Sequence, residues 1–427
     1  MEKERNLTGR NVVMGLQHTF VMFGATVLVP IISGLDIGVA LFAAGIGTWI
    51  FHIITGFKVP VFLGSSFAFL PGLAAIIGGS IKDTSQIPYA MAGMIVAGLL
   101  YVIVGVIFKF VSPDKLYKIL PPHVTGPMII LIGMILAPVA IQNANGSNSA
   151  DIVAKIGIGG CWALAAATFA FGVFIKVAFP KFGLKFLSNL PVLLALIFGY
   201  ILACILGVVN FKPVIDAAWF GLPKFSLPSF SGPVAIKSIS IMVPIAIVTM
   251  VEHFGDILAI GNVVGKDFIK SPGIHRTLWG DGIATSVAAL MGGPANTTYS
   301  ENTGAVALTG ASNPIIMRIA ACFAILLALI PKFTELIATI PGPVIGGISI
   351  LLFGMISSIG IKNMVDAQIN LANPKLLIVS AVMLVLGLGG AAIDLGPVHL
   401  SGLGLAAIAG IILNLILRPK DIKSADS

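Results

Sequence analysis

The chain has 427 residues, of which 57% are hydrophobic and only 10% are charged. Soluble domains carry about 25% charged residues, and no soluble core could bury so much apolar side chain. The composition therefore excludes a soluble globular protein and predicts an all-α polytopic membrane protein. The net charge of +8 is then assigned to cytoplasmic loops that face anionic lipid, so no nucleic-acid partner is expected.

Apolar runs bounded by glycine, proline or charged residues predict fourteen membrane segments. In the first half they cover residues 12–32, 38–55, 60–77, 88–110, 123–141, 157–178 and 190–209. In the second half they cover residues 235–258, 276–291, 297–308, 314–330, 341–358, 374–390 and 399–417. The runs 60–77 and 297–308 are the weakest, since a helix needs about 20 residues to cross a bilayer.

The placement of lysine and arginine predicts an orientation for these segments. If the N-terminus is cytoplasmic and the segments alternate, 19 of the 25 basic residues fall on the cytoplasmic side. The other six are Lys82, Lys155, Lys212, Lys224, Lys237 and Lys332. Because cytoplasmic loops carry an excess of Lys and Arg, this bias predicts that both termini lie in the cytoplasm.

The chain divides at the long loop 210–234, with seven predicted segments on each side. Two related halves with an odd number of segments must lie in opposite orientations, as in inverted-repeat transporters. Segment three contains GSSFAF (64–69), and its counterpart, segment ten, contains NTTYSEN (296–302). Both pair small hydroxyl residues with an aromatic residue, and the hydroxyl side chains favour turn or extended backbone. Interruptions at matching positions of two halves predict a binding site at mid-membrane depth.

Two carboxylates, Glu252 and Glu301, lie in stretches that otherwise belong inside the bilayer. A charged group at that depth costs about 2.5–3.5 kcal/mol on insertion scales, so such residues usually bind a ligand or carry a proton. On a helix, Asp256 lies one turn beyond Glu252 on the same face. Repulsion and low dielectric would favour binding of a proton there near neutral pH, as a proton-coupled carrier requires. The alternatives are a structural polar pair for Glu252 and, for Asp256, a helix cap or contact with cytoplasmic water.

Glu301, one further acid and two histidines have open roles. Glu301 precedes a helix-like run, where a carboxylate is also favoured as a helix cap. Asp281 has glycine on both sides and is predicted to relay a proton or to orient another group. His253 points about 100° away from Glu252 on a helix, so it is not expected on the same face. His18 is expected either to orient an acid or to make a structural hydrogen bond.

No motif for another chemistry accompanies these acids. The sequence has no HExxH or clustered Cys/His pattern, no P-loop GxxxxGK[ST], and no Ser/His/Asp set at a supported spacing. We therefore expect no enzyme activity, no metal site and no direct use of ATP. The available chemistry is recognition of a flat polar ring. The two glutamates can bind ring N–H groups, main-chain N–H groups at the broken helices can bind carbonyls, and Phe67 or Tyr299 can stack on the ring.

The residues around these acids resemble a known family. GSSFAF, the pair Glu252–His253 and NTTYSENTGAVALTG are similar to the nucleobase–ascorbate transporters, also called nucleobase:cation symporter family 2. The signature of that family reads Gln, Glu or Pro, then Asn-x-Gly, four residues, Thr, and Arg, Lys or Gly. It is complete here as Glu301, Asn302, Gly304, Thr309 and Gly310. LQHTFVMFGATVLVP and AAWFGLP resemble the bacterial uracil permease branch, and the resemblance covers essentially the whole chain.

The resemblance implies a fold of fourteen segments in two inverted halves of seven, with short antiparallel strands breaking segments three and ten. A core domain would comprise residues 1–110 (segments 1–4) and 235–333 (segments 8–11). A gate domain would comprise residues 111–234 (segments 5–7) and 334–427 (segments 12–14 and a cytoplasmic tail). Substrate would lie between core and gate, and the core would move against the gate. Members are commonly dimers, so a homodimer in a bacterial cytoplasmic membrane is expected.

By matched position, the resemblance implies a substrate site that contains Phe67, Glu252, Tyr299, Ser300 and Glu301. Glu252 and Glu301 resemble the ring-binding acids, and Phe67 resembles the stacking aromatic residue. The main chain at Tyr299 and Ser300 would adjoin the ring.

The acids give different indications of the ring class. Glutamate as the first signature residue, here Glu301, is typical of uracil carriers, whereas xanthine and urate carriers usually have Gln. Asp256 stands where uracil carriers commonly have His, and Asp281 resembles an acid of the xanthine branch. Asp256 and Asp281 are the predicted proton-coupling residues, with the proton as coupling ion and no cofactor. The sequence therefore predicts a proton-coupled uracil importer, with a xanthine or other purine carrier as the alternative.

Two functions from other classes remain open. One is a channel or passive exchanger for small polar solutes, whose uptake would not respond to a collapsed proton gradient. The other is an anion carrier of similar seven-plus-seven architecture, for sulfate or bicarbonate. An anion carrier would place helix N-termini and basic residues at its site, and the acids at this site argue against it.

Overall fold

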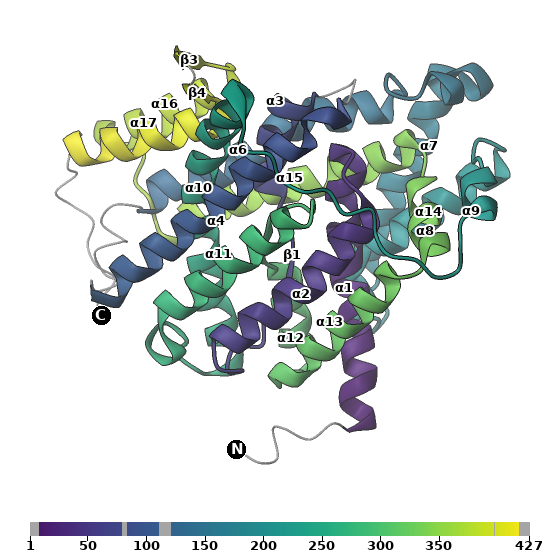
Figure 1. Ribbon diagram of the computed structural model, residues 1–427, viewed down its shortest axis with the longest axis horizontal. Helices are drawn as coiled ribbons and strands as arrows, with labels where there is room; N and C mark the ends of the chain where they lie inside the picture. Colours follow the sequence, from purple (N-terminus) through teal and green to yellow (C-terminus); the bar gives the residue numbers. More distant parts are fainter. Residues whose placement is uncertain (1–7, 79–82, 111–120, 397, 418–427) are drawn as a thin grey trace.

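The computed structural model describes residues 8–78, 83–110, 121–396 and 398–417, and the chain is mostly helical (Figure 1). The predicted cytoplasmic tail beyond residue 417 and short parts of the predicted domains, at 1–7, 79–82 and 111–120, lie outside the described residues. The first half contains α1 (Gly9–Ser33), α2 (Ile37–Ile54), β1 (Leu63–Ser65), η1 (Phe67–Phe69), α3 (Leu70–Ile77), η2 (Thr84–Gln86), α4 (Ile87–Phe110), α6 (Pro122–Ala144), α7 (Ala150–Ala178), η3 (Leu187–Asn189), α8 (Pro191–Ile205) and α9 (Lys212–Asp216). The second half contains α10 (Gly232–Val264), η4 (Ile269–Gly273), α11 (Ile274–Leu290), β2 (Asn296–Thr298), α12 (Ser300–Thr309), α13 (Pro314–Ala328), α14 (Pro331–Ala338), α15 (Gly342–Asp366), α16 (Pro374–Leu388), β3 (Ala392–Leu395), β4 (Val398–Ser401) and α17 (Gly402–Leu417).

Each predicted apolar run corresponds to a helix or, at 60–77 and 297–308, to a short strand followed by short helical segments. Within the described part of the chain, seven helices are long and apolar enough to cross a membrane, namely α1, α2, α4, α6, α7, α10 and α15. The pair α13 and α14, bent by 84°, would make an eighth crossing if it is one span. The prediction of a multi-pass membrane protein is therefore confirmed, and the number of fourteen segments stays a prediction.

Local chemistry defines where the helices near the centre begin and end. The side chain of Asp36 caps α2 by accepting a hydrogen bond of 2.8 Å from the main-chain N–H of Val39. The helix α10 ends at Gly265 and α12 ends at Gly310, and both glycines have the positive φ of a left-handed C-cap (69° and 68°). These caps end α10 after 33 residues, with Pro244 inside the helix, and end α12 after only 10.

The long helices pack in two groups (Figure 1). One group contains α1, α2, α4, α10, α11 and α13, and the other contains α6, α7, α8, α15, α16 and α17. Glycines allow the backbones within each group to come close, since a Cβ atom at Gly98 of α4 would lie 2.5 Å from the carbonyl oxygen of Gly282 in α11. A Cβ atom at Gly133 of α6 would lie 2.2 Å from the carbonyl oxygen of Phe353 in α15. The two groups meet where α10 contacts α6 and α17, and where α1 contacts α8.

The strands β1 and β2 pair antiparallel in the interior, as the family resemblance implies for segments three and ten. Leu63 lies opposite Thr298, and Ser65 lies opposite Asn296. All residues of both strands are buried, so the main-chain groups of the two breaks satisfy one another where no water is present. This pairing fixes the two polar interruptions side by side at the centre of the molecule.

A second hairpin, β3–β4, was not predicted from the sequence. It replaces part of the run 399–417, so α17 begins only at Gly402. The main-chain N–H of His399 donates a hydrogen bond of 2.8 Å to the side chain of Ser240, which ties the hairpin to α10.

Candidate substrate site

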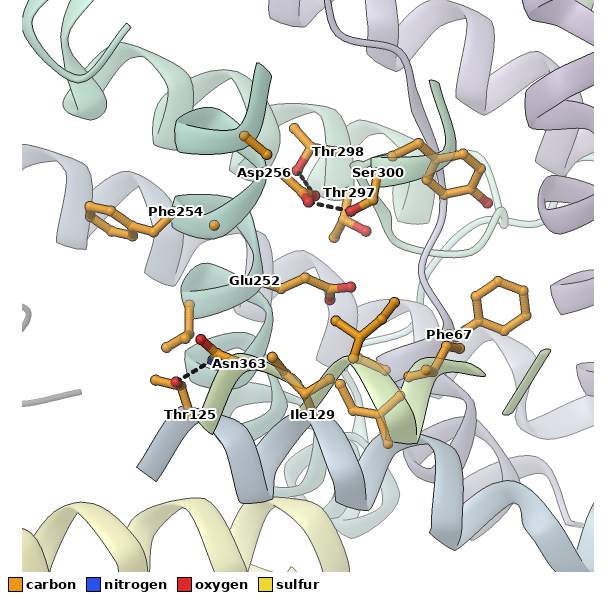
Figure 2. A pocket seen from close by; sticks show the side chains of 18 of the residues that line it. Phe67, Thr125, Ile129, Glu252, Phe254, Asp256, Thr297, Thr298, Ser300 and Asn363 are labelled. Carbon is orange, nitrogen blue, oxygen red and sulfur yellow. Dashed lines mark hydrogen bonds between the residues drawn. The ribbon is translucent and has the colours of Figure 1, made fainter. Parts of the chain in front are cut away.

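A cavity of about 460 Å³ lies between the two helix groups, at the level of the paired strands (Figure 2). One wall is polar and comes from α10, α12 and the two breaks; its residues are Ser65, Ser66, Glu252, Asp256, Thr297, Thr298, Tyr299, Ser300 and Glu301. The facing wall comes from α6 and α15, and its apolar part includes Ile129, Ile132, Ile356 and Ile359. A concave site of this size, mainly apolar with a few polar groups, suits a small-molecule ligand.

Glu252 enters this cavity from the middle of α10. Its side chain is half-buried and points between the Asp256 cluster and Ile129 (Figure 2). The continuous helix places Asp256 one turn further on, and both carboxyl groups line the cavity, as predicted for this face.

Asp256 joins α10 to the second strand break. Its side chain accepts a hydrogen bond of 2.8 Å from the hydroxyl of Thr298 and another from the hydroxyl of Ser300 (Figure 2). Only 6% of Asp256 is exposed, and α10 continues to Val264 beyond it. The alternative that Asp256 caps a helix end or faces cytoplasmic water is therefore wrong.

Asp281 lies behind the cavity wall. It is fully buried in α11 and does not line the cavity, and its carboxylate lies 3.1 Å from Nδ1 of His253. The other ring nitrogen of His253 lies 3.0 Å from the hydroxyl of Thr277. His253 thus points away from the cavity, as expected from the helical geometry, and Asp281 contacts α10 through His253.

Glu301 reaches the cavity from the first turn of α12. The helix begins at Ser300, and the side chain of Glu301 is exposed to the cavity. The neighbouring Asn302 fixes α12 to α1, because its Nδ2 donates a hydrogen bond of 3.3 Å to the carbonyl of His18 and lies 3.2 Å from His18 Nδ1. Of the two roles left open for His18, the structure shows the structural hydrogen bond.

Tyr299 braces the two breaks against each other. Its hydroxyl donates a hydrogen bond of 2.9 Å to the carbonyl of Ser65, and only 5% of the residue is exposed. Gly64 makes room for this ring, since a Cβ atom there would lie 2.5 Å from it. The side chain of Tyr299 is therefore packed away from the position needed to stack on a ligand, while its main chain adjoins the cavity.

Phe67 lines the cavity at the start of η1 and is half-buried. Its ring packs edge-on against Phe353 of α15, with the ring centres 6.2 Å apart and the planes at 73°. In Figure 2 the ring points away from Glu252. The structure thus places Phe67 at the cavity, and stacking over a ligand beside Glu252 would require its side chain to turn.

Several lining residues were missed in the sequence. Asn363 of α15 donates a hydrogen bond of 3.0 Å to the hydroxyl of Thr125 in α6, on the wall opposite α10 (Figure 2). Lys362 and Asp366 lie on the same stretch of the wall. No spacing pattern points to these residues, because they come from two helices more than 200 positions apart.

The cavity is rich in carboxyl groups. Glu252, Asp256 and Glu301 all line it, and Lys362 is the basic residue among its described lining residues. Within the described ranges, no three His, Cys, Asp or Glu side chains are arranged to hold a metal ion. Such a site can accept hydrogen bonds from N–H groups of a neutral ring and can hold a proton on a carboxyl group.

The chain is similar to known membrane permeases. Residues 9–396 match the profile of a group described as "Permease family" (Xan_ur_permease). The chain is 43% identical over 408 residues to a "Probable uracil permease" of Haemophilus influenzae, covering 95% of this chain and 93% of the relative. It is 41% identical over 422 residues to the "Uracil permease" of Bacillus subtilis, covering 97% and 94%. Among solved structures, the transmembrane domain of the cyanobacterial bicarbonate transporter BicA shares the fold, with a TM-score of 0.65 at 15% identity, covering 96% of this chain and 98% of that one.

Proposed function

The chain belongs to the permease family that its sequence matches over residues 9–396, and from that premise we propose that it imports uracil by proton-coupled symport. Relatives that are 41–43% identical over nearly the whole chain carry the name uracil permease or probable uracil permease. The observation that carries the proposal is that Glu252 and Glu301 face one cavity from two different elements, beside the paired strands.

Uracil fits the chemistry of this cavity. It is a flat ring whose two N–H groups and two carbonyl oxygens lie in one plane. Glu252 and Glu301 would accept hydrogen bonds from the N–H groups. Main-chain N–H groups in the first turn of α12, which begins at Ser300, would donate to a carbonyl oxygen. Phe67 would turn to cover the face of the ring.

Asp256 is the proposed binding site of the coupling proton, with no other cofactor. It is held by two hydroxyl groups, from Thr298 and Ser300, that can donate to the carboxylate. Loss of its charge on protonation would weaken both hydrogen bonds, and both partners belong to the break that carries Glu301. Asp281 would act on the same helix, α10, through its contact with His253.

We further propose that transport proceeds by alternating access between two domains. The core would comprise residues 1–110 and 235–333, and the gate residues 111–234 and 334–427, related as two inverted repeats of seven segments. The packing of α10 and α11 in one helix group, and of α6 and α15 in the other, supports this division. A homodimer in a bacterial cytoplasmic membrane with both termini in the cytoplasm completes the proposal.

The test is uptake of labelled uracil and labelled xanthine into proteoliposomes, with and without an inward proton gradient. We expect uracil to accumulate and the gradient to drive it. If neither base is taken up, the proposal is wrong. If xanthine is taken up in preference to uracil, the substrate is a purine. Uracil uptake that does not respond to the gradient would indicate a passive carrier or channel. Uptake of bicarbonate or sulfate in place of a base would indicate an anion carrier.

A further inference from the structure

We propose that Gly255 sets the largest ring substituent that the cavity accepts. The inference deepens the proposed uracil transport and rests on it. Gly255 lies in the interior of α10, three residues after Glu252 and next to Asp256. Glycine in a helix interior costs about 1 kcal/mol relative to alanine, so its presence here calls for a reason.

Close packing does not supply that reason. At Gly98 and Gly133 an added Cβ atom would collide with the backbone of a neighbouring helix. At Gly255 an added Cβ atom would meet no heavy atom within 4 Å, and φ at this position is that of an ordinary helix. Alanine would therefore fit the fold at Gly255 and favour the helix.

The open space at Gly255 belongs to the cavity. Gly255 is exposed and lines the same cavity as Glu252 and Asp256. It lies about 4.5 Å further along α10 than Glu252, because each helical residue rises about 1.5 Å. A side chain at this position would enter the space of the cavity that Glu252 and Asp256 also line.

Other open glycines in the described helices do not share this position. Gly159, Gly304 and Gly354 also have no heavy atom within 4 Å of an added Cβ atom, and none of the three lines the cavity. Gly354, in the interior of α15, is the matched control: it is exposed, helical and open, and Gly354→Ala changes the surface of the helix without narrowing the cavity.

The experiment measures competition against labelled uracil uptake by 5-substituted uracils of increasing bulk, with fluoro, methyl and bromo groups. In the original protein, which has Gly255, we expect all three compounds to compete with uracil. In Gly255→Ala, the inhibition constants of the methyl and bromo compounds should rise about 10-fold relative to uracil, the effect of one methyl group on discrimination in a tight site. Gly255→Val should extend the loss to uracil itself. Gly354→Ala should leave the inhibition constant of each compound unchanged relative to that of uracil.

A thermal unfolding measurement on the purified variants distinguishes a narrowed cavity from a defect in folding. Gly255→Ala should unfold at the same or a higher temperature than the unsubstituted chain, since alanine favours the helix. The proposal would be overturned if both Gly255 variants kept the same ratios of inhibition constants as the original protein. It would also be overturned if the variants lost all compounds equally and unfolded at a lower temperature, or if the original protein already rejected the methyl and bromo compounds. Absence of uracil uptake by the unsubstituted chain would overturn the proposed function and this inference together, whereas intact uptake with unchanged ratios would overturn this inference alone.

Discussion

The two strand breaks use the same backbone arrangement and carry different chemistry. Each is a buried strand of three residues that pairs with the other and leads into short helical segments. In the first break, Ser65 donates a hydrogen bond of 3.0 Å to the carbonyl of Thr26 and its own carbonyl receives Tyr299. In the second, Thr298 and Ser300 donate to Asp256, and Glu301 follows directly in the cavity.

This difference indicates that the two breaks have separate roles: the first mainly supplies strand pairing, and the second supplies the groups proposed to recognise the ligand. The first break supplies a fixed main-chain partner and one aromatic side chain at the cavity, Phe67. The second supplies Glu301 and the two hydroxyl groups that hold the carboxylate of Asp256 in α10. Substitutions in the second break should therefore change transport, and most substitutions in the first should change stability.

The largest effect should come from Glu301→Gln in the second break. A hydrogen bond to a charged group contributes roughly 1.5–3 kcal/mol, so kcat/KM for uracil uptake should fall about 100-fold. The measurement is uptake normalised to the amount of protein in the membrane, which should not change because the side chain is exposed to the cavity. Unchanged uracil uptake would remove Glu301 from the site.

Asp256→Asn tests the linkage between α10 and the second break. An amide cannot gain and lose the proton, so accumulation of uracil driven by the gradient should fall about 10-fold. Exchange of internal for external uracil should fall less, because that mode requires no net proton movement. Ser300→Ala is the companion variant, since it removes one donor and leaves the carboxylate. Equal losses of both modes in Asp256→Asn would argue against a proton role.

Phe67→Ala probes the aromatic side chain that the first break contributes to the cavity. Loss of an aromatic contact should weaken uracil binding about 5-fold, as aromatic pairs contribute about 0.5–1.5 kcal/mol beyond area burial. Phe67→Tyr, which keeps the ring, should bind uracil with nearly unchanged affinity. If Phe67→Ala also binds normally, the ring stays against Phe353 throughout the cycle.

The smallest effect on transport should come from Ser65→Ala. The variant loses one buried hydrogen bond to the main chain of Thr26, so the free energy of unfolding should fall by about 1 kcal/mol. KM for uracil should not change, because the carbonyl that receives Tyr299 remains. A changed KM without a change in stability would show that the first break also takes part in recognition.

Local patterns in the sequence identified both breaks and the shared face of Glu252 and Asp256. Helical periodicity and the hydroxyl-rich runs act over a few residues, so they can be seen without a fold. The partners of Asp256 could not be found this way, because Thr298 lies 42 positions away. The pair Thr125 and Asn363 spans 238 positions and depends on the packing of α6 against α15. The hairpin β3–β4 was missed because β3 falls in the connection between the predicted segments 374–390 and 399–417, and β4 overlaps only the start of the second.

The central claim is that Glu252 and Glu301 hold one ring between them. Equilibrium binding of labelled uracil to the purified protein tests it, with Glu252→Gln, Glu301→Gln and the double variant measured side by side. Each single variant should lose about 10-fold or more in affinity, and the double variant should lose less than the two losses combined, because both groups act on the same ligand. Uracil binding that is unchanged in either single variant, in a protein that binds uracil, would contradict the claim.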